Sequence, residues 1–220
     1  MKTLRTSVVA GATVLLFSGG LQAANVVPNS TFESGLNDWL EFPLGGTIGL
    51  AADNGPSAPG VQAAELVADA SGGASFPQIK VERLAEGLLI DGAPVTVSFD
   101  AKATLQTQGF PDIAGDVVFI AELFTERTGD NGATNEILLG PPTFLTSEWQ
   151  TFTYNTTLGP DAGGGVSLLF KADCGANPNC RLTALIDNVT IDTAVVPVPA
   201  AVWLFGSALG LLGWIRRKAA

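Results

Sequence analysis

Short runs in which apolar and polar residues alternate recur along most of this chain. In residues 95–101 every odd position is apolar and every even position is polar. A period of two places successive side chains on opposite faces of a strand, so one face of this segment is predicted to meet a core and the other to meet water. Residues 149–157 show a similar pattern, with Phe152 and Tyr154 on one face and threonines on the other.

Nine segments of this kind predict strands, because they are rich in β-branched and aromatic residues and are separated by Gly, Pro, Asn and Asp. The predicted strands are 47–51, 61–68, 78–84, 95–103, 116–125, 135–139, 149–157, 166–172 and 182–191. Helical periodicity is scarce, and the one helix-like stretch, 81–89, is interpreted as strand and loop. The predicted fold class is therefore all-β, an antiparallel β-sandwich with a jelly-roll topology.

The N-terminal 24 residues have the layout of a secretory signal peptide. Lys2 and Arg5 precede an uncharged stretch from residue 7 to residue 21, and the small residues Ala23 and Ala24 follow. This order of charge, apolar core and small residues predicts export, with cleavage after Ala23 or Ala24. An uncleaved anchor is the alternative, but the apolar core is shorter than the roughly 20 residues that span a bilayer.

The C-terminal segment, residues 195–220, has three parts. A Pro-x-Pro motif is followed by an uncharged apolar run over 200–215 and then by a basic cluster. Together with residues 195–199 the run approaches the roughly 20 residues of a transmembrane helix. Basic residues are retained on the cytoplasmic side, so everything upstream is expected outside the inner membrane. The residues that define this signal are Pro197, Pro199, Arg216 and Arg217.

This tail resembles the PEP-CTERM sorting signals of Gram-negative bacteria, in the variant written VPLPA. Residues 196–200 read VPVPA and depart from that variant only at Val198. The resemblance implies transient residence in the inner membrane and removal of the tail by an exosortase, a membrane-embedded cysteine protease. It also implies delivery of the freed domain to the cell surface or extracellular matrix. A plain C-terminal anchor has the same hydropathy and stays open as an alternative.

Residues 25–194 are long enough for one domain with a substantial core. They contain all 21 acidic residues of the chain and six Lys and Arg, which gives a net charge of −15. Such a domain is repelled by phosphate backbones and by anionic lipid headgroups, so nucleic acid is excluded as a partner. Divalent cations are suitable partners for the same reason.

Cys174 and Cys180 are the only cysteines, and five residues separate them. An even number of cysteines in an exported chain predicts a disulfide. The loop it closes is short, so its entropic stabilisation is expected to stay below the ~3 kcal/mol of a fifteen-residue loop. A zinc site is the rival interpretation, and it lacks ligands because the chain has no His and no second pair of cysteines.

A second resemblance covers nearly the whole central domain. Residues 26–35 (VVPNSTFESG) and 185–191 (LIDNVTI) resemble the first and last strands of galactose-binding-like jelly rolls, especially the carbohydrate-binding modules attached to xylanases and glucanases. Residues 95–103 and 149–153 lie where those modules have comparable strands. The resemblance implies a non-catalytic domain that binds or organises extracellular polysaccharide.

In that family a Glu, an Asp and the backbone carbonyl two residues before the Glu hold a structural calcium ion. Carried over to this chain, the ligands are Glu33, Asp187 and the carbonyl of Thr31. First and last strands lie side by side in such a sandwich, so the two carboxylates are expected to approach each other and to need a neutralising cation. In the alternative, Glu33 caps a turn and Asp187 accepts backbone amides.

The sequence indicates less about ligand binding and catalysis than about the fold and the export signals. Tyr154 is the preferred sugar contact if a sandwich face is used, because its ring is apolar and its tip is polar. The absence of His excludes Ser-His-Asp and Cys-His catalysis. The sequence therefore predicts a protein that is not an enzyme. Two rivals stay open: a purely structural matrix protein, and a small polysaccharide-acting enzyme that uses carboxylates such as Asp116, Glu122 and Glu126.

Overall fold

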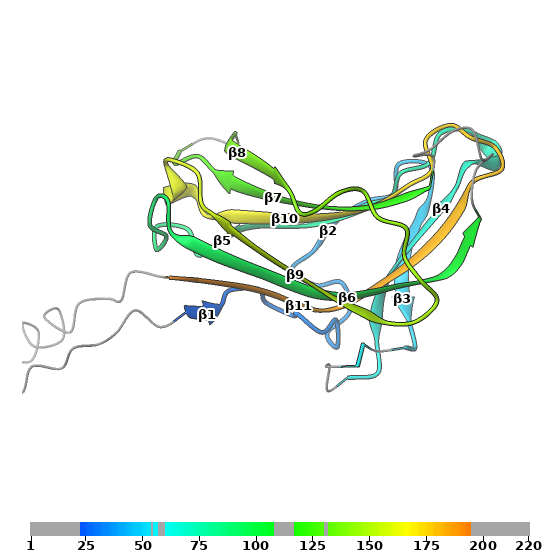
Figure 1. Ribbon diagram of the computed structural model, residues 1–220, viewed down its shortest axis with the longest axis horizontal. Coiled ribbons are helices and arrows are strands. Elements are labelled where there is room, and N and C mark those ends of the chain that lie inside the picture. Colours follow the sequence, from blue (N-terminus) through cyan, green and yellow to red (C-terminus); the bar gives the residue numbers. More distant parts are fainter. Residues whose placement is uncertain (1–22, 54, 57–59, 108–116, 130–131, 195–220) are drawn as a thin grey trace, which may run out of the picture.

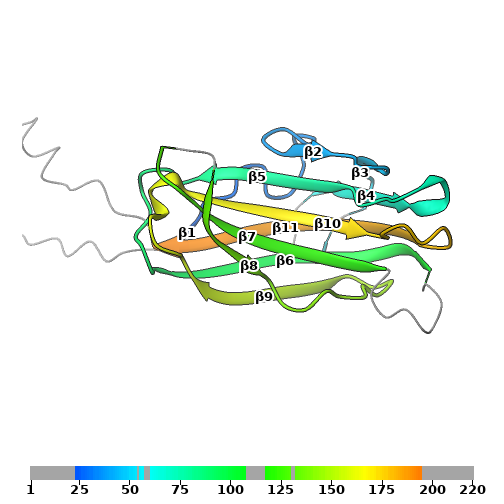
Figure 2. The ribbon, with the colours of Figure 1, turned by 90° about the horizontal axis from the view of Figure 1, so that it is seen from above.

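The computed structural model describes residues 23–53, 55–56, 60–107, 117–129 and 132–194. These residues form two antiparallel β-sheets packed face to face (Figures 1 and 2). Sheet A has six strands in the order β3-β4-β11-β6-β9, with β1 paired to β11, and sheet B has five in the order β2-β5-β10-β7-β8. Most consecutive strands belong to different sheets, as in a jelly roll.

The strands of sheet A are β1 (Ala23–Asn25), β3 (Thr47–Ala51), β4 (Ala63–Asp69), β6 (Pro94–Thr107), β9 (Gln150–Thr157) and β11 (Arg181–Ala194). The strands of sheet B are β2 (Leu40–Phe42), β5 (Gln78–Leu84), β7 (Val118–Glu126), β8 (Ala133–Leu138) and β10 (Val166–Asp173). Two 3-10 turns, η1 (Ala70–Gly72) and η2 (Ala162–Gly164), complete the described elements. The predicted all-β sandwich is confirmed.

The described residues include no α-helix, and none of their helices is long and apolar enough to cross a membrane. The predicted signal peptide up to residue 22, Pro197, Pro199 and the basic cluster lie outside the described residues.

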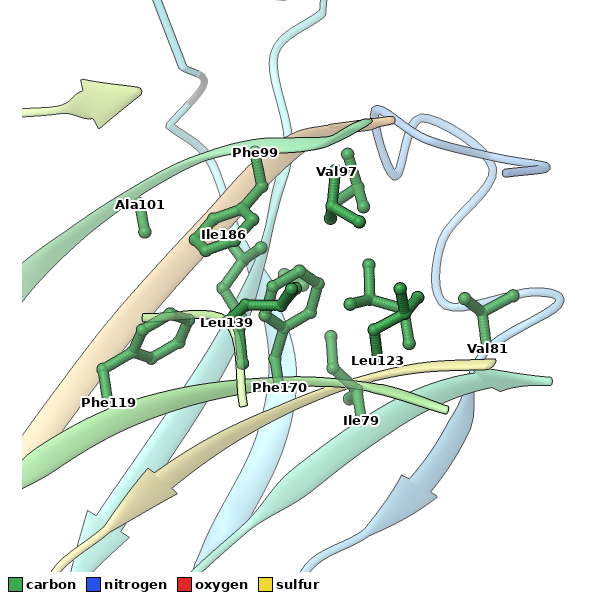
Figure 3. Packing of buried hydrophobic residues seen from close by; sticks show 14 of the residues in the cluster. Ile79, Val81, Val97, Phe99, Ala101, Phe119, Leu123, Leu139, Phe170 and Ile186 are labelled. Atoms are coloured by element: carbon green, nitrogen blue, oxygen red, sulfur yellow. The ribbon is translucent and has the colours of Figure 1, made fainter. Parts of the chain in front are cut away.

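Side chains from the inner faces of both sheets fill the core (Figure 3). Phe99 of β6 lies at its centre, with its ring centroid 4.8 Å from that of Phe170 on β10 and 6.0 Å from that of Phe119 on β7. Phe99 follows the alternation of its strand, because its neighbours Val97 and Ala101 are also buried. Burying a side chain of this size contributes about 1.5–3 kcal/mol, so these rings are a main source of stability.

The resemblance predicted a first strand over residues 26–35, and this prediction is wrong. Residues 28–38 form turns, and the ladder with β11 is made by β1, just before them, although the backbone of Val26 and Ser30 still bonds Ile191 and Val189. Asn29 has a φ of 46°, and its side-chain NH₂ donates to the carbonyls of Gly35 and Asn37 while its oxygen accepts the amide of Ser34. An Asn side chain that bonds nearby backbone in this way offers an alternative to a strand ladder.

The described chain begins and ends on adjacent strands. Ala23 pairs with Ala194, and Asn25 pairs with Asp192. The side-chain oxygen of Asn25 also accepts the amides of Val27 and Ile191, both at 3.0 Å. The cleavage site predicted after Ala23 or Ala24 therefore falls inside β1, and Asn25 is the residue that would keep the contact with β11.

The predicted disulfide between Cys174 and Cys180 is confirmed. Both cysteines are fully buried at the end of β10 and the start of β11. The amide of Cys174 donates to the carbonyl of Ser75, and the carbonyl of Cys180 accepts the amide of Ala70. The bridge thus holds its own loop against the segment around η1.

Candidate functional site

Two carboxylates meet in the middle of sheet A. Asp100 of β6 and Asp187 of β11 are paired residues on neighbouring strands, and each is fully buried. Like charges directly opposite each other in a sheet are destabilising, and burial removes the water that would screen them. This pair therefore needs a compensating interaction if both side chains are to stay buried.

Hydrogen bonds reach both carboxylates. The amides of Gly55 and Asn188 each donate to Asp187 at 2.7 Å. The Thr151 hydroxyl donates to Asp100 at 2.5 Å, and the side-chain NH₂ of Asn188 lies 3.5 Å from Asp100. Asn188 has a φ of 50° and sits where the β11 register shifts, so a local bulge aims both of its donors at the acids.

Burial raises the pKa of Asp187 above its ordinary value, and this is the largest influence on it. The two backbone amides oppose the rise, whereas the negative charges of Asp100 and Glu33 add to it. The amides give each oxygen of Asp187 one hydrogen bond without supplying a positive charge. The charge of the group is therefore still uncompensated.

Glu33 and Thr31 lie in the turn segment before β2. Glu33 is exposed, and its Oε1 accepts the amides of Val61 at 2.7 Å and Gln62 at 3.0 Å. Glu33 acts on the pKa of Asp187, so the structure places it in the neighbourhood of the acid pair. Across the described part of the chain, no group of three or more Asp, Glu, Cys or His side chains is arranged to hold a metal ion.

The fit to calcium is thus partial. Asp100 and Asp187 supply buried oxygen ligands and an unmet need for positive charge, which suits Ca²⁺. The backbone contacts of Glu33 and Asp187 match the alternative drawn from the sequence. Asp100 was missed because its strand alternation places it among residues facing water, whereas in the fold Gly55, Thr151 and Asn188 lie against it.

A tryptophan lies beside this region on the outer side of sheet A. Lys102 of β6 forms an ion pair with Asp53 at 2.6 Å, and its ammonium lies 5.0 Å from the ring centroid of Trp149. The Trp149 indole N–H donates to Asp53 at 3.2 Å. The Trp149 ring is therefore already engaged by a cation.

The second candidate surface is the outer face of sheet B, named here the concave face. Both layers bend in the same direction, and the outer face of sheet B lies inside the curve (Figure 1). One row of paired residues crosses all five strands of this face. From β2 to β8 it reads Leu40, Lys80, Leu169, Glu122 and Leu138.

Strand spacing of about 4.8 Å makes this row about 19 Å wide. Exposed apolar side chains mark its two edges: Leu40 is 45% exposed and Leu138 is 46% exposed. Phe42, beside Leu40 on β2, is 38% exposed. Between these edges the charged Lys80 and Glu122 lie on either side of the buried Leu169, so the face has apolar margins and a mixed floor.

A cluster of polar side chains, named here the Lys80 cluster, consists of Lys80, Glu82, Glu126 and Ser167. The ammonium of Lys80 lies 2.9 Å from Glu82 and 3.5 Å from Glu126. The Ser167 hydroxyl donates to Glu126 at 2.6 Å. Glu126 is only 5% exposed, an unusual position for a carboxylate. Lys80, Glu82 and Glu126 of this cluster, together with Arg83, border a depression of about 190 Å³.

The backbone beside the Lys80 cluster is bulged. Val166 pairs with Leu84 and Leu168 pairs with Val81, so Glu82 and Arg83 together oppose Ser167. Arg83 has a φ of 53°, and its amide donates to the Ser167 hydroxyl at 3.1 Å. A bulge re-aims side chains, and here it turns Glu82 and Arg83 toward the depression.

The residues proposed from sequence for sugar contact and catalysis lie apart from one another. Tyr154 on β9 of sheet A is half-buried, its ring centroid is 6.2 Å from that of Phe99, and burial raises its pKa. Glu122 and Glu126 share the outer face of β7, as their spacing indicated. Asp116 falls outside the described residues.

No family model matches the sequence, and no curated protein sequence matches it either. Solved structures match in fold. The CBM22-1 xylan-binding domain from Paenibacillus barcinonensis Xyn10C is 13% identical, with a TM-score of 0.50 over 81% of this chain and 100% of that domain. A cyclase from Fischerella sp. TAU is 13% identical, with a TM-score of 0.53 over 80% of this chain and 100% of that protein.

The enzymatically active domain of tailspike protein 4 of bacteriophage CBA120 is 14% identical, with a TM-score of 0.56 over 77% of this chain. The match spans only 21% of that tailspike chain. At these identities the similarity establishes the β-sandwich fold alone. A binding domain and enzymes share it, so the function has to be argued from the surface.

Proposed function

We propose that this domain is a non-catalytic module that binds extracellular polysaccharide on its concave face. The observation that carries the proposal is the row that crosses all five strands of sheet B, with Leu40 and Leu138 at its edges and Lys80 and Glu122 within it. A sugar unit has apolar C–H faces and a rim of hydroxyls. It therefore needs both kinds of contact on one shallow surface.

The carboxylates of this face are poorly arranged for glycoside hydrolysis. Glu122 and Glu126 are four residues apart on one strand, about 13 Å along it, whereas the two carboxyl groups of a glycosidase are about 5–9.5 Å apart. Glu82 and Glu126 lie closer together, but the Lys80 ammonium contacts both of them. The ammonium between these two acids occupies the place where a scissile bond would have to lie.

A structural calcium ion belongs to the same proposal. The ligands would be the carboxylate of Asp187 and, as an addition to the sequence-based set, that of Asp100, with Glu33 and the Thr31 carbonyl at the turn. The support is the unmet charge of the buried acids. Calcium would neutralise them and fix the loop that contributes Gly55. It would have no part in chemistry.

The proposal also includes the cellular location of the domain. Export, processing by an exosortase and release to the cell surface or matrix rest on the N-terminal and C-terminal sequence patterns alone. In that setting the concave face would bind or organise exopolysaccharide around the cell. The rival is a matrix protein with the same fold, the same route and no affinity for glycans.

The test is calorimetric titration of the domain with neutral polysaccharides. Replacing Phe42 and Leu40 by Ala is expected to weaken binding about tenfold, because an aromatic contact contributes about 0.5–1.5 kcal/mol beyond its buried area. Leu105→Ala is the matched control, since it removes a 50% exposed leucine from sheet A. Tyr154→Ala tests the alternative contact on β9. No heat with any glycan would favour the structural matrix protein.

A further inference from the structure

We propose that the Lys80 cluster is a sugar subsite that takes one neutral sugar unit through two adjacent hydroxyl groups. The inference rests on the proposed function and specifies the ligand class. One hydroxyl would donate to the Glu126 carboxylate, and its neighbour would accept from the Lys80 ammonium. Both protein groups border the same depression of about 190 Å³.

The carboxylate of Glu126 has one oxygen that is already bonded and one that is open. Its Oε1 accepts both the Ser167 hydroxyl, at 2.6 Å, and the Lys80 ammonium, at 3.5 Å. No hydrogen bond from the described residues reaches its Oε2. Among the described residues, Trp39 Nε1 is the one buried side-chain nitrogen or oxygen without a partner, so Oε2 of Glu126 is open to the depression and to water. Since the depression borders this carboxylate, a hydroxyl bound there is a suitable donor for the second oxygen.

The ammonium of Lys80 is held in place and keeps one donor for a ligand. Its ammonium is fixed by Glu82 at 2.9 Å and lies 5.0 Å from the ring centroid of Phe124. An ammonium has three donors. Glu82 and Glu126 direct two of them, which leaves one for a ligand. Because these contacts already fix the side chain, binding costs little additional conformational entropy.

The backbone holds the cluster in place. A non-glycine residue such as Arg83 in the left-handed region is strained, and such strain persists only where the surroundings enforce it. Here the Arg83 amide and the Glu126 carboxylate both bond the Ser167 hydroxyl, which ties the bulge to the acid. The Arg83 side chain is engaged separately by Glu86 at 3.0 Å.

Charge and size select the ligand. The depression is lined by two acids, Glu82 and Glu126, and two bases, Lys80 and Arg83, but Glu86 already pairs with Arg83, so negative charge is in excess. A sugar that carries a carboxylate or sulfate would therefore be repelled. The depression is smaller than the ~300–1,000 Å³ of sites for drug-sized ligands, which suits a single sugar ring.

The experiment uses matched pairs of glycans. Polyuronates and their carboxyl-reduced, neutral counterparts are titrated into the domain, beside neutral glucan, xylan, mannan and galactan oligosaccharides. The wild-type domain is expected to bind neutral members and to reject the uronate of each pair. Glu126→Gln keeps the shape and removes the charge, and it is expected to weaken binding about tenfold or more.

Glu136→Gln is the matched control, because Glu136 is exposed on the same face opposite Phe124 and lies outside the cluster. Lys80→Gln is the second variant, and thermal melting shows which variants are folded. If both cluster variants unfold, the subsite is still tested by whether the wild-type domain prefers each polyuronate or its carboxyl-reduced counterpart. Preference for uronates, or full affinity in folded Glu126→Gln, overturns the subsite and leaves the proposed function standing. Absence of all glycan binding overturns both.

Discussion

Asp100 and Asp187 lie opposite each other on β6 and β11, and neither side chain has any measurable exposure. Three kinds of donor reach them: backbone amides, a hydroxyl and a side-chain amide. All of these are neutral. Burial raises the pKa of Asp187, so a cation beside the pair or a proton on Asp187 would offset the repulsion, and the pair ties the stability of sheet A to solution conditions.

Calcium is expected to stabilise the domain. A chelator should lower the melting temperature, and the loss corresponds to about 2.7 kcal/mol if the ion had been present at one hundred times its dissociation constant. Asp187→Asn should remove most of this dependence, while the exposed Asp38→Asn should keep it. Calorimetric melts with chelator and with millimolar calcium provide the measurement. Identical curves would mean that the amides alone satisfy the acids.

Ionisation of Glu122 should make the folded domain less stable as the pH rises. Burial raises its pKa above 4.5, Lys171 opposes the rise and Glu136 adds to it. The folded state therefore holds this proton more tightly than the unfolded state, so ionisation of Glu122 lowers stability as pH rises through the folded pKa. The melting temperature of Glu122→Gln should rise relative to wild type between about pH 4 and 7. A difference that stays flat with pH would contradict this.

Reduction of the disulfide should have a small effect on the fold. Cys174 and Cys180 are six positions apart, so the bridge constrains little of the unfolded chain. We expect the stability to fall by less than ~3 kcal/mol and the circular dichroism spectrum to keep its β character. Peptide mapping of native material should find both thiols protected from alkylation until reduced. Thiols that react beforehand would contradict the predicted oxidation.

Phe99 should be the most costly aromatic residue to truncate. Its ring contacts Phe119, Phe152, Tyr154 and Phe170. Phe99→Ala is expected to lower the free energy of unfolding by about 3–5 kcal/mol, because the cavity lies between both sheets. Phe144→Ala removes a half-exposed ring and should change it by no more than about 0.5 kcal/mol. Urea denaturation of the two variants compares them directly.

The mature protein should lack the C-terminal segment. The VPVPA motif predicts removal of everything from about Trp203 onward. Intact-mass spectrometry of protein from the native envelope or medium is the direct measurement. If all of the protein retained residues 203–218, the exosortase route would be wrong and a plain anchor would replace it.

Periodicity predicted strands such as β4, β5 and β7 well because their inward-facing residues are buried and most of the residues between them are partly exposed. The segment 78–84 coincides with β5 at both ends, and 47–51 coincides with β3. β2 was missed because its three residues are all exposed, so it shows no alternation. The turn built on Asn29 was missed because its hydrogen bonds depend on the positions of residues five to eight further along.

The candidate surfaces were harder to predict than the strands. Asp187 was found through a family resemblance, whereas Asp100 becomes its partner only through the pairing of β6 with β11. The Lys80 cluster combines side chains from β5, β7 and β10, whose register no local pattern specifies. Sequence spacing showed that Glu122 and Glu126 share a strand face, but it could not show that Lys80 sits beside Glu126.

In a chain that keeps the whole of β1, the pairing of Ala23 with Ala194 has a mechanical consequence. Tension applied across the two ends of the described chain would part β1 from β11 one residue pair at a time, starting from the outermost pair. Opening a three-residue strand in this way takes little force, because the bonds break in sequence and never bear the load together. The load would next reach β11, which lies between β4 and β6 at the centre of its sheet. The domain would thus yield a short length of chain under a weak pull and resist a stronger one.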